Sequence, residues 1–95
     1  MPRALKIDSR DNVAVLLEDV KAGDLVEVVG QEVRDYVTAV QEIKQGHKIA
    51  LVDIPKGSYV YKYGEPIGIA TRDIKRGEHV HVHNLDSVRG KVMNV

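Results

Sequence analysis

One short pattern occurs four times in this 95-residue chain and restricts the folds that it can adopt. Each copy has an acidic residue, a branched apolar residue, two mostly polar positions and a glycine. The copies lie in residues 18–23, 41–46, 52–57 and 72–77. An acid can accept a backbone N–H two residues on, and glycine readily takes a positive φ, so each copy predicts a tight turn. Because the glycines are unequally spaced, the pattern predicts a compact fold with four similar corners rather than a solenoid.

The segments between these turns have the composition of β-strands. Valine and isoleucine outnumber leucine by 23 to six, and branched side chains favour pleated strands. We therefore predict an all-β domain over residues 1–84, followed by a mobile tail at 85–95. In residues 31–43 the valines also fit a helical stripe, and a strand is favoured there. The predicted strands are 4–7, 12–17, 25–29, 33–39, 47–51, 59–63, 67–71 and 79–83.

Composition excludes several classes of protein. The absence of cysteine excludes a disulfide framework, an iron–sulfur cluster and a thiolate metal site, and it favours the cytoplasm for so small a domain. Basic and acidic residues balance at 14 each, so nucleic acid is not an expected partner. No apolar run approaches the length that spans a membrane, so we expect no membrane association.

Three of the four histidines stand at alternate positions, 79, 81 and 83. In a strand this alternation would put the three imidazoles on one face and the intervening valines toward the core. Two histidines at i and i+2 can ligate one metal ion, and a third ligand would come from His47, from a carboxylate or from another chain. The alternatives are a solvated polar face and a histidine face that a partner completes.

A second stripe at alternate positions consists of Tyr59, Tyr61 and Tyr63. Tyrosine-rich strand faces are common at interfaces, and partial burial under a loop is the alternative. Residues 64–68 contain two glycines and a proline, which predict a tight turn. A phosphate-binding loop there is poorly supported because no helical pattern follows. The sequence also shows no nucleophile with a base beside it and no dinucleotide-binding motif.

Three blocks of sequence carry a family resemblance. Residues 46–51 read Gly-His-Lys-Ile-Ala-Leu, residues 62–68 read Lys-Tyr-Gly-Glu-Pro-Ile-Gly, and residues 79–85 read His-Val-His-Val-His-Asn-Leu. At these blocks the chain resembles the N-terminal domain of altronate and galactarate dehydratases, which belongs to the SAF (antifreeze-like) group. Residues 12–15 also match the dehydratase subgroup. The resemblance implies an all-β β-clip fold with little helix.

The resemblance also implies a hydro-lyase that removes water from a sugar acid and gives a 2-keto-3-deoxy acid. Such enzymes use a divalent metal, Fe²⁺ or Mn²⁺, which would stabilise an enediolate while a general acid protonates the departing hydroxyl. The chain ends 11 residues after Asn84, where the fused enzymes continue into a large catalytic portion. We therefore expect a small subunit that needs a separate large catalytic dehydratase subunit. A fragment of a fused protein is the alternative.

Site residues follow from the same blocks. The resemblance implies catalytic roles for His81 and His83, at a site shared with the partner. It implies a metal site at His79, His81 and His83 that is incomplete without the partner. The positions that it implies for binding an anionic sugar-acid substrate are His47, Lys48, Lys62, Tyr63 and Asn84. The lysine charges suit an anion, although a solvated side chain is the alternative for each.

Other functions are also open at this point. The small subunit of sulfolactate sulfo-lyases resembles the same domain, but those enzymes expel sulfite instead of water. A non-catalytic SAF module that binds a sugar acid or a protein partner is the rival from a different class. For the isolated chain, a homo-oligomer linked through the histidine face is a further alternative.

Overall fold

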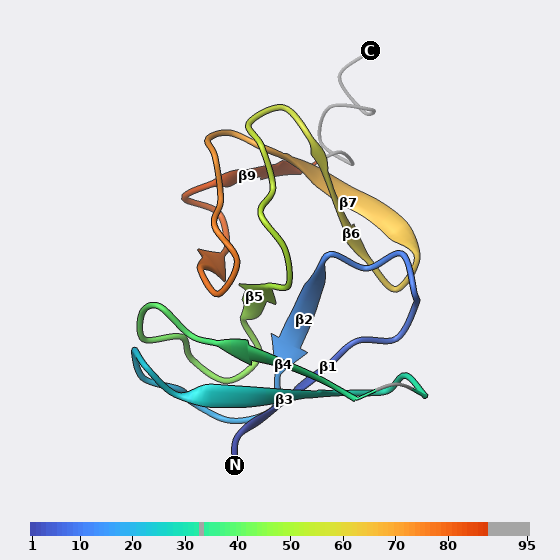
Figure 1. Cartoon of the computed structure of the whole chain (residues 1–95). Helices are drawn as coiled ribbons and strands as arrows, with labels where there is room; N and C mark the ends of the chain where they lie inside the picture. Colours follow the sequence, from blue (N-terminus) through green and yellow to red (C-terminus); the bar gives the residue numbers. More distant parts are fainter. Residues whose placement is uncertain (33, 88–95) are drawn as a thin grey trace.

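The computed structural model describes residues 1–32 and 34–87, and within these ranges the chain forms strands and turns without a helix. Consequently no helix in these ranges could cross a membrane. The strands are β1 (Arg3–Leu5), β2 (Val13–Leu16), β3 (Leu25–Val29), β4 (Asp35–Thr38), β5 (Lys48–Ala50), β6 (Tyr59–Lys62), β7 (Glu65–Ala70), β8 (His79–Val80) and β9 (Leu85–Ser87) (Figure 1).

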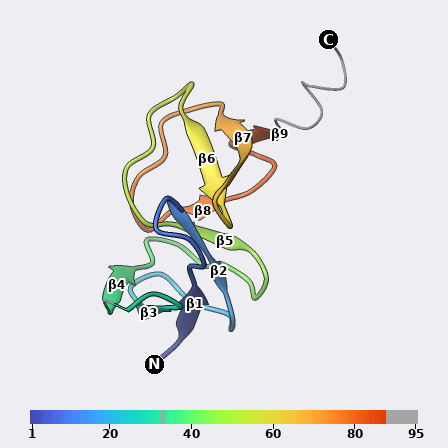
Figure 2. The same cartoon turned by 90° about the vertical axis from the view of Figure 1, so that its right-hand side faces the viewer.

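The strands form two sheets. The larger has the order β4-β3-β1-β2-β5-β8, and the smaller has the order β6-β7-β9. Among the strands of the described residues, β1 and β3 pair in parallel and the other neighbouring strands pair antiparallel. Figures 1 and 2 show the smaller sheet at one end of the molecule and β3 and β4 at the other, with β2 and β5 between them. The all-β prediction is confirmed.

The first eight strands each overlap a predicted strand. Segment 31–43 contains β4, in which Val37 is buried while Tyr36 and Thr38 are exposed. This two-residue alternation is that of a strand and not of a helix.

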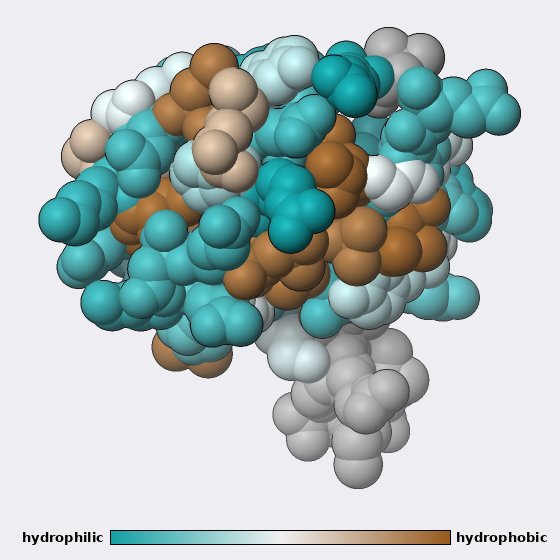
Figure 3. Space-filling model, turned by 90° about the horizontal axis from the view of Figure 1, so that it is seen from below, coloured by the Kyte–Doolittle hydropathy of each residue, from teal (hydrophilic) through white to brown (hydrophobic). Residues whose placement is uncertain are grey.

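Figure 3, seen from below β3 and β4, shows hydrophobic surface bordered by hydrophilic side chains. On these two strands the exposed large hydrophobic residues are Leu25 and Tyr36.

The end of the chain differs from the prediction. The strand predicted at 79–83 is wrong beyond Val80, where β8 ends and a turn over residues 81–84 begins. Val82 is 81% exposed instead of facing the core. The tail was predicted to start at Leu85, but Leu85–Ser87 form β9 and pair with β7. The rest of the predicted tail, 88–95, lies outside the described residues.

The four repeated turns associate in two pairs. Val20 forms an isolated β-bridge with Ile43, and Ile54 forms one with Ile74. These four branched residues are all buried, as the pattern predicts. The glycines that close the turns, at positions 23, 46, 57 and 77, have φ values of 92°, 84°, 88° and 90°. The predicted glycine-dependent turns are therefore confirmed.

The sequence predicted that each acid of the pattern would accept a backbone N–H within its own turn. In the structure, three of these acids accept a backbone N–H of another turn. Oδ1 of Asp53 accepts a hydrogen bond from the backbone N of Arg76 at 2.9 Å. Reciprocally, Oδ1 of Asp73 accepts from the backbone N of Lys56 at 2.9 Å. In the other pair, Asp19 caps the turn that contains Gln45. Each of these acids thus stabilises the turn opposite its own.

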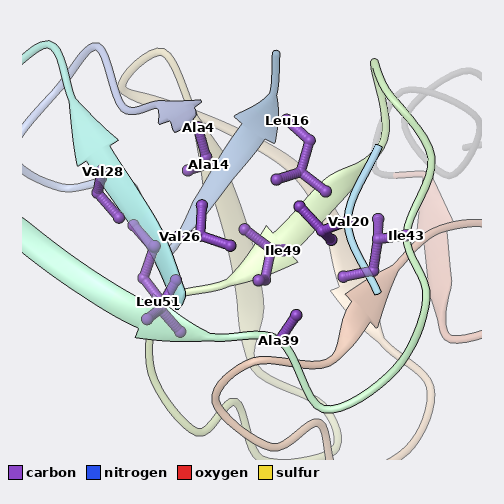
Figure 4. Close-up of a cluster of buried hydrophobic side chains, with 11 residues drawn as sticks. Ala4, Ala14, Leu16, Val20, Val26, Val28, Ala39, Ile43, Ile49 and Leu51 are labelled. Atoms are coloured by element: carbon purple, nitrogen blue, oxygen red, sulfur yellow. The ribbon is translucent and has the colours of Figure 1, made fainter. Parts of the chain in front are cut away.

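The core divides into two aliphatic clusters, which β2 and β5 separate. Ala14 and Ile49 point into the first cluster, whereas their neighbours Val13 and Ala50 point into the second. These two strands therefore contribute buried side chains from both faces. Figure 4 shows the first cluster, which comprises Ala4, Ala14, Leu16, Val20, Val26, Val28, Val37, Ala39, Ile43, Ile49 and Leu51. The second comprises Val13, Ala50, Ile54, Val60, Ala70, Ile74 and Val80.

Candidate functional site

Three histidines from two distant segments form a cluster where β5 meets β8. The strands pair antiparallel with Lys48 opposite Val80, and one further step in this register places His47 beside His81. The rings of His47 and His81 stack with their centroids 4.2 Å apart. Nδ1 of His47 and Nε2 of His79 lie 2.8 Å apart, at hydrogen-bonding distance. Strand pairing therefore brings together side chains that are far apart in the sequence.

Asn84 holds the turn that carries His81. Its side chain is 1% exposed, and its Oδ1 accepts a hydrogen bond from the backbone N of His81 at 3.0 Å. Its Nδ2 donates to the backbone O of His79 at 2.9 Å. Both ends of the amide of Asn84, which the resemblance implies for substrate binding, are therefore hydrogen-bonded to backbone groups.

The cluster has the composition of a metal site. One nitrogen each from His47, His79 and His81 lies within 4.8 Å of the other two. The metal set implied by the resemblance contained His83, whereas the spacing of the histidines left His47 open as a third ligand. His83 is exposed and its ring centroid lies 5.0 Å from that of His79, but it is not one of the three. Nδ1 of His81 is buried and has no hydrogen-bond partner among the described residues, so it can serve as a donor atom to a metal ion.

The surroundings favour neutral imidazoles. Burial, together with the charges of His83, His47, His81 and Lys48, lowers the pKa of His79 to about 4, and burial has the largest effect. The pKa of His81 is also lowered, first by burial and then by His47, Lys48 and His83. Neutral imidazoles keep a nitrogen lone pair for coordination, so protons compete little with a metal ion at neutral pH.

The two predicted substrate lysines, Lys48 and Lys62, have different surroundings. Burial lowers the pKa of Lys48, and the Lys62 ammonium lowers it further. Nζ of Lys62 lies 5.1 Å from the centroid of the Tyr63 ring. Tyr63 is 48% exposed and adopts a positive φ of 57° in the turn between β6 and β7. The structure therefore places Lys48 near the histidine cluster and Lys62 next to Tyr63.

Asn12 hydrogen-bonds the backbone of the strand that carries the tyrosine stripe, and the sequence pattern did not predict this contact. The ring centroids of Tyr59 and Tyr61 lie 6.2 Å apart, and the strand has an irregular register after Val60. Nδ2 of Asn12 donates to the backbone O of Tyr59, and its Oδ1 accepts from the backbone N of Tyr61. Asn12 was noted only as part of a matching block, and its role depends on a contact across 47 residues.

The phosphate-binding alternative at residues 64–68 gains no support. The backbone N of Gly64 donates to Oδ1 of Asp11 at 2.8 Å. Oδ2 of the same carboxylate accepts from the backbone N of Asp8 at 3.1 Å. Asp11 is 5% exposed, so this carboxylate joins two loops inside the domain and occupies the amide that a phosphate would need.

Comparison with known proteins gives consistent matches. A family model described as the altronate/galactarate dehydratase SAF domain matches residues 2–88. The altronate dehydratase of Escherichia coli (strain K12) is 51% identical over 80 residues, which cover 84% of this chain and 15% of that protein. The altronate dehydratase of Bacillus subtilis (strain 168) is 44% identical over 86 residues, which cover 88% and 16%.

A third relative has a different name and length. The (2R)-sulfolactate sulfo-lyase subunit alpha of Chromohalobacter salexigens is 36% identical over 85 residues, which cover 86% of this chain and 90% of that subunit. The chain thus spans 15–16% of the altronate dehydratases it matches but most of this subunit. The relatives are dehydratases and lyases, so the matched segment occurs in enzymes of both kinds.

Proposed function

The chain belongs to the altronate/galactarate dehydratase SAF-domain family, and from that premise we propose that it is the SAF component of a metal-dependent sugar-acid dehydratase. It acts with a separate large catalytic subunit to remove water from a sugar acid and give a 2-keto-3-deoxy acid. The observation that carries the proposal is the cluster of His47, His79 and His81. Two of the sequence blocks that resemble the family supply these three side chains.

Iron(II) or manganese(II) is the metal of this proposal. Three nitrogens within 4.8 Å of one another, and the unpartnered Nδ1 of His81, fit a divalent cation. Imidazole ligands suit iron, whereas Mn²⁺ prefers oxygen ligands, which substrate or the partner subunit would add. When bound, the cation supplies Lewis-acid stabilisation of negative charge on a carboxylate oxygen. Three protein ligands leave coordination positions open, as in catalytic metal sites.

The other residues have separate roles in the proposal. Lys48 and Lys62 attract the substrate anion, and Tyr63 lies next to Lys62. His83 is exposed and outside the set of three, so it is the histidine that can exchange a proton with the departing hydroxyl. The sequence implied a catalytic role for His81 as well, and its place in the cluster supports metal ligation instead. Asn84 positions the histidines through the backbone.

A separate partner is supported by the sulfo-lyase relative. That protein is named as a subunit, and this chain covers 90% of it. The altronate dehydratases contain about six times as much chain as the matched segment, which leaves room for the catalytic portion. In the proposal the large subunit covers the histidine cluster and completes the site.

A chimera tests the proposal. The segment of the Escherichia coli altronate dehydratase that matches this chain is replaced by residues 2–88. We expect the chimera to dehydrate altronate, and we expect the same protein without the segment to be inactive. A chimera carrying His47→Ala should fold and lose activity. If the intact chimera folds, binds metal and has no activity on altronate or galactarate, the dehydratase proposal is wrong.

Sulfolactate sulfo-lyase is the second candidate, and the near-complete coverage of its subunit alpha favours it. The test is to replace subunit alpha of the Chromohalobacter salexigens enzyme with this chain and to measure sulfite released from (2R)-sulfolactate. Sulfite release together with an inactive altronate chimera would select this function. Failure of both exchanges would favour a non-catalytic SAF binding module.

A further inference from the structure

The two-residue turn between β6 and β7 holds a tyrosine in a conformation that tyrosine disfavours. Tyr63 and Gly64 have φ values of 57° and 76°, and the flanking residues Lys62 and Glu65 pair across the turn. Two positive φ values indicate a type I′ hairpin turn, in which asparagine, aspartate and glycine are preferred. Within the described part of the chain, Tyr63 is alone among non-glycine residues in having a positive φ. Its bulky side chain is therefore a source of strain in this turn.

The rest of the fold fixes this turn through its glycine and does not need the tyrosine ring. The backbone N of Gly64 donates to Oδ1 of the buried Asp11, in the loop between β1 and β2 that lies beside the turn in Figure 1. A Cβ at Gly64 would lie 2.7 Å from Oδ2 of Asp8 and 2.8 Å from Nη2 of Arg10, so the same loop packs closely on the turn. A smaller residue in place of Tyr63 would leave these contacts intact.

The ring of Tyr63 contributes little to the packing of the domain. The residue is 48% exposed, and Nζ of Lys62 lies 5.1 Å from the ring centroid. A cation–π contact at an exposed site is weak. Tyr63 does not line the hollow of about 250 Å³ at His81, so a small molecule held there would not explain the strain. A strained residue that adds little to stability indicates a function.

An exposed aromatic ring on a rigid turn is suited to anchor a protein interface. Tyrosine is enriched among the few residues that dominate binding energy. A side chain whose backbone is already fixed loses less entropy on binding than one on a mobile loop. The relatives indicate what lies opposite, because the altronate dehydratases contain about six times as much chain as the matched segment, and the sulfo-lyase relative is named as a subunit.

We propose that Tyr63 is an interface anchor, whose ring inserts between apolar side chains of the large catalytic subunit. This role differs from the substrate contact that the family resemblance implies for Tyr63, and it rests on the proposed function for the identity of the partner. The turn is strained in the free domain because its sequence serves the assembled enzyme. Relief of the strain should therefore stabilise the free chain and weaken the assembly.

The first measurement is the melting temperature of the full 95-residue chain, followed by circular dichroism. We expect Tyr63→Asn to raise it by about 4 °C, since asparagine tolerates a positive φ. Tyr63→Phe keeps the ring and the strain, and it should leave the melting temperature unchanged. Tyr59→Asn is the matched control, because Tyr59 is 49% exposed but lies in strand β6. Asparagine is disfavoured in strands, so the melting temperature should not rise. The absence of a rise in Tyr63→Asn would overturn the proposal.

The second measurement is hydroxyl-radical footprinting with mass spectrometry, which reports the exposure of each tyrosine side chain. It compares the full chain with the altronate chimera. We expect oxidation of Tyr63 to be slower in the chimera by roughly 10-fold, because interface anchors lie in pockets that exclude water. Tyr36 is the internal control, since it lies on β4 at the opposite end of the molecule and is 38% exposed. The sulfo-lyase in which this chain replaces subunit alpha provides a second assembly.

The outcomes separate an interface from the other contacts that the ring could make. Equal oxidation of Tyr63 in the free chain and in both assemblies would overturn the anchor. Protection that appears only after altronate is added would also overturn it and assign the ring to substrate. Protection in the free chain that increases with its concentration would instead assign the ring to a second copy. An active chimera with an unprotected Tyr63 would disprove the anchor and leave the proposed function intact. Protection of Tyr63 in a chimera that folds, binds metal and is inactive would support the anchor and contradict the dehydratase proposal.

Discussion

Asn84 shows how one side chain can fix the position of others that carry the chemistry. A carboxamide donates and accepts at the same time, and Asn84 uses both functions within the β8 turn. Its backbone O also accepts from the backbone N of Thr71 at 3.0 Å. The buried amide thus links the turn to the neighbouring segment and keeps His79 and His81 close together.

Replacement of this amide should destabilise the domain. We expect Asn84→Ala to lower the free energy of unfolding by about 1–3 kcal/mol, because two buried backbone groups lose their partner. Urea denaturation followed by circular dichroism measures the difference. His83→Ala is the control, since an exposed side chain at that position should change stability by less than about 0.5 kcal/mol. Equal stability of the two variants would contradict the positioning role.

At the scale of elements, the segments next to the repeated turns explain why similar glycines are under different constraints. Gly23 and Gly77 have nearly equal φ values of 92° and 90°. A Cβ at Gly23 would meet nothing within 4 Å, whereas one at Gly77 would lie 2.2 Å from the backbone O of Thr38. Gly23 is constrained by conformation alone, whereas Gly77 is constrained by conformation and by its close approach to the end of β4.

This difference gives a matched pair of substitutions. Gly23→Ala should cost about 1–2 kcal/mol, the usual penalty for an L-residue in a left-handed conformation. Gly77→Ala should cost more than that, because the backbone must also move away from Thr38. The two free energies of unfolding can be compared in urea. A smaller loss for Gly77→Ala than for Gly23→Ala would show that the close approach is not a constraint.

The histidine cluster joins two elements, so metal binding should depend on both. In a titration of the isolated chain with Co²⁺, followed by its visible absorption, we expect weak binding through the three histidines. His47→Ala should reduce the affinity by more than about 10-fold, because it removes a ligand. His83→Ala should leave it within about twofold, since His83 lies outside the set of three. The reverse ranking would restore the metal set predicted from sequence.

The turns and strands that depend on local sequence pattern were predicted correctly. The end of β8 and the place of His47 were not, because they depend on contacts between residues that no local pattern contains. Branched residues and glycines revealed the turns and eight strands, and the block resemblance revealed the family. The His-Val-His-Val-His alternation is that of a strand, yet Asn84 bends the chain after Val80. Placing His47 beside His81 required the pairing of β5 with β8, which no local pattern contains.

At the scale of the whole molecule, the small size of the described domain prevents it from enclosing a catalytic site alone. Its buried side chains are mainly aliphatic and its core is divided between two small clusters. The described hollows are open at the surface rather than enclosed in the fold. Dehydration of a sugar acid gains most of its rate from groups held in a water-excluded site. Such a site would need protein on the other side of the histidine cluster.

We therefore expect the purified chain to show no turnover of altronate, galactarate or (2R)-sulfolactate, even with Fe²⁺ or Mn²⁺ present. The measurement is formation of the 2-keto-3-deoxy acid or of sulfite, compared with a blank that contains metal but no protein. The altronate chimera is the positive control for the assay. Turnover above the blank by the chain alone would show that it needs no large subunit.

The position of β1 has a consequence for how the protein is made. This strand is synthesised before β2 and β3, but it lies between them inside the larger sheet. Its parallel partner β3 is synthesised about twenty residues later, so β1 stays unpaired on that side until translation has passed β3. Shortening the N-terminus by five residues would thus remove an interior strand. The nascent chain would then expose two bare strand edges, which favour association with other chains.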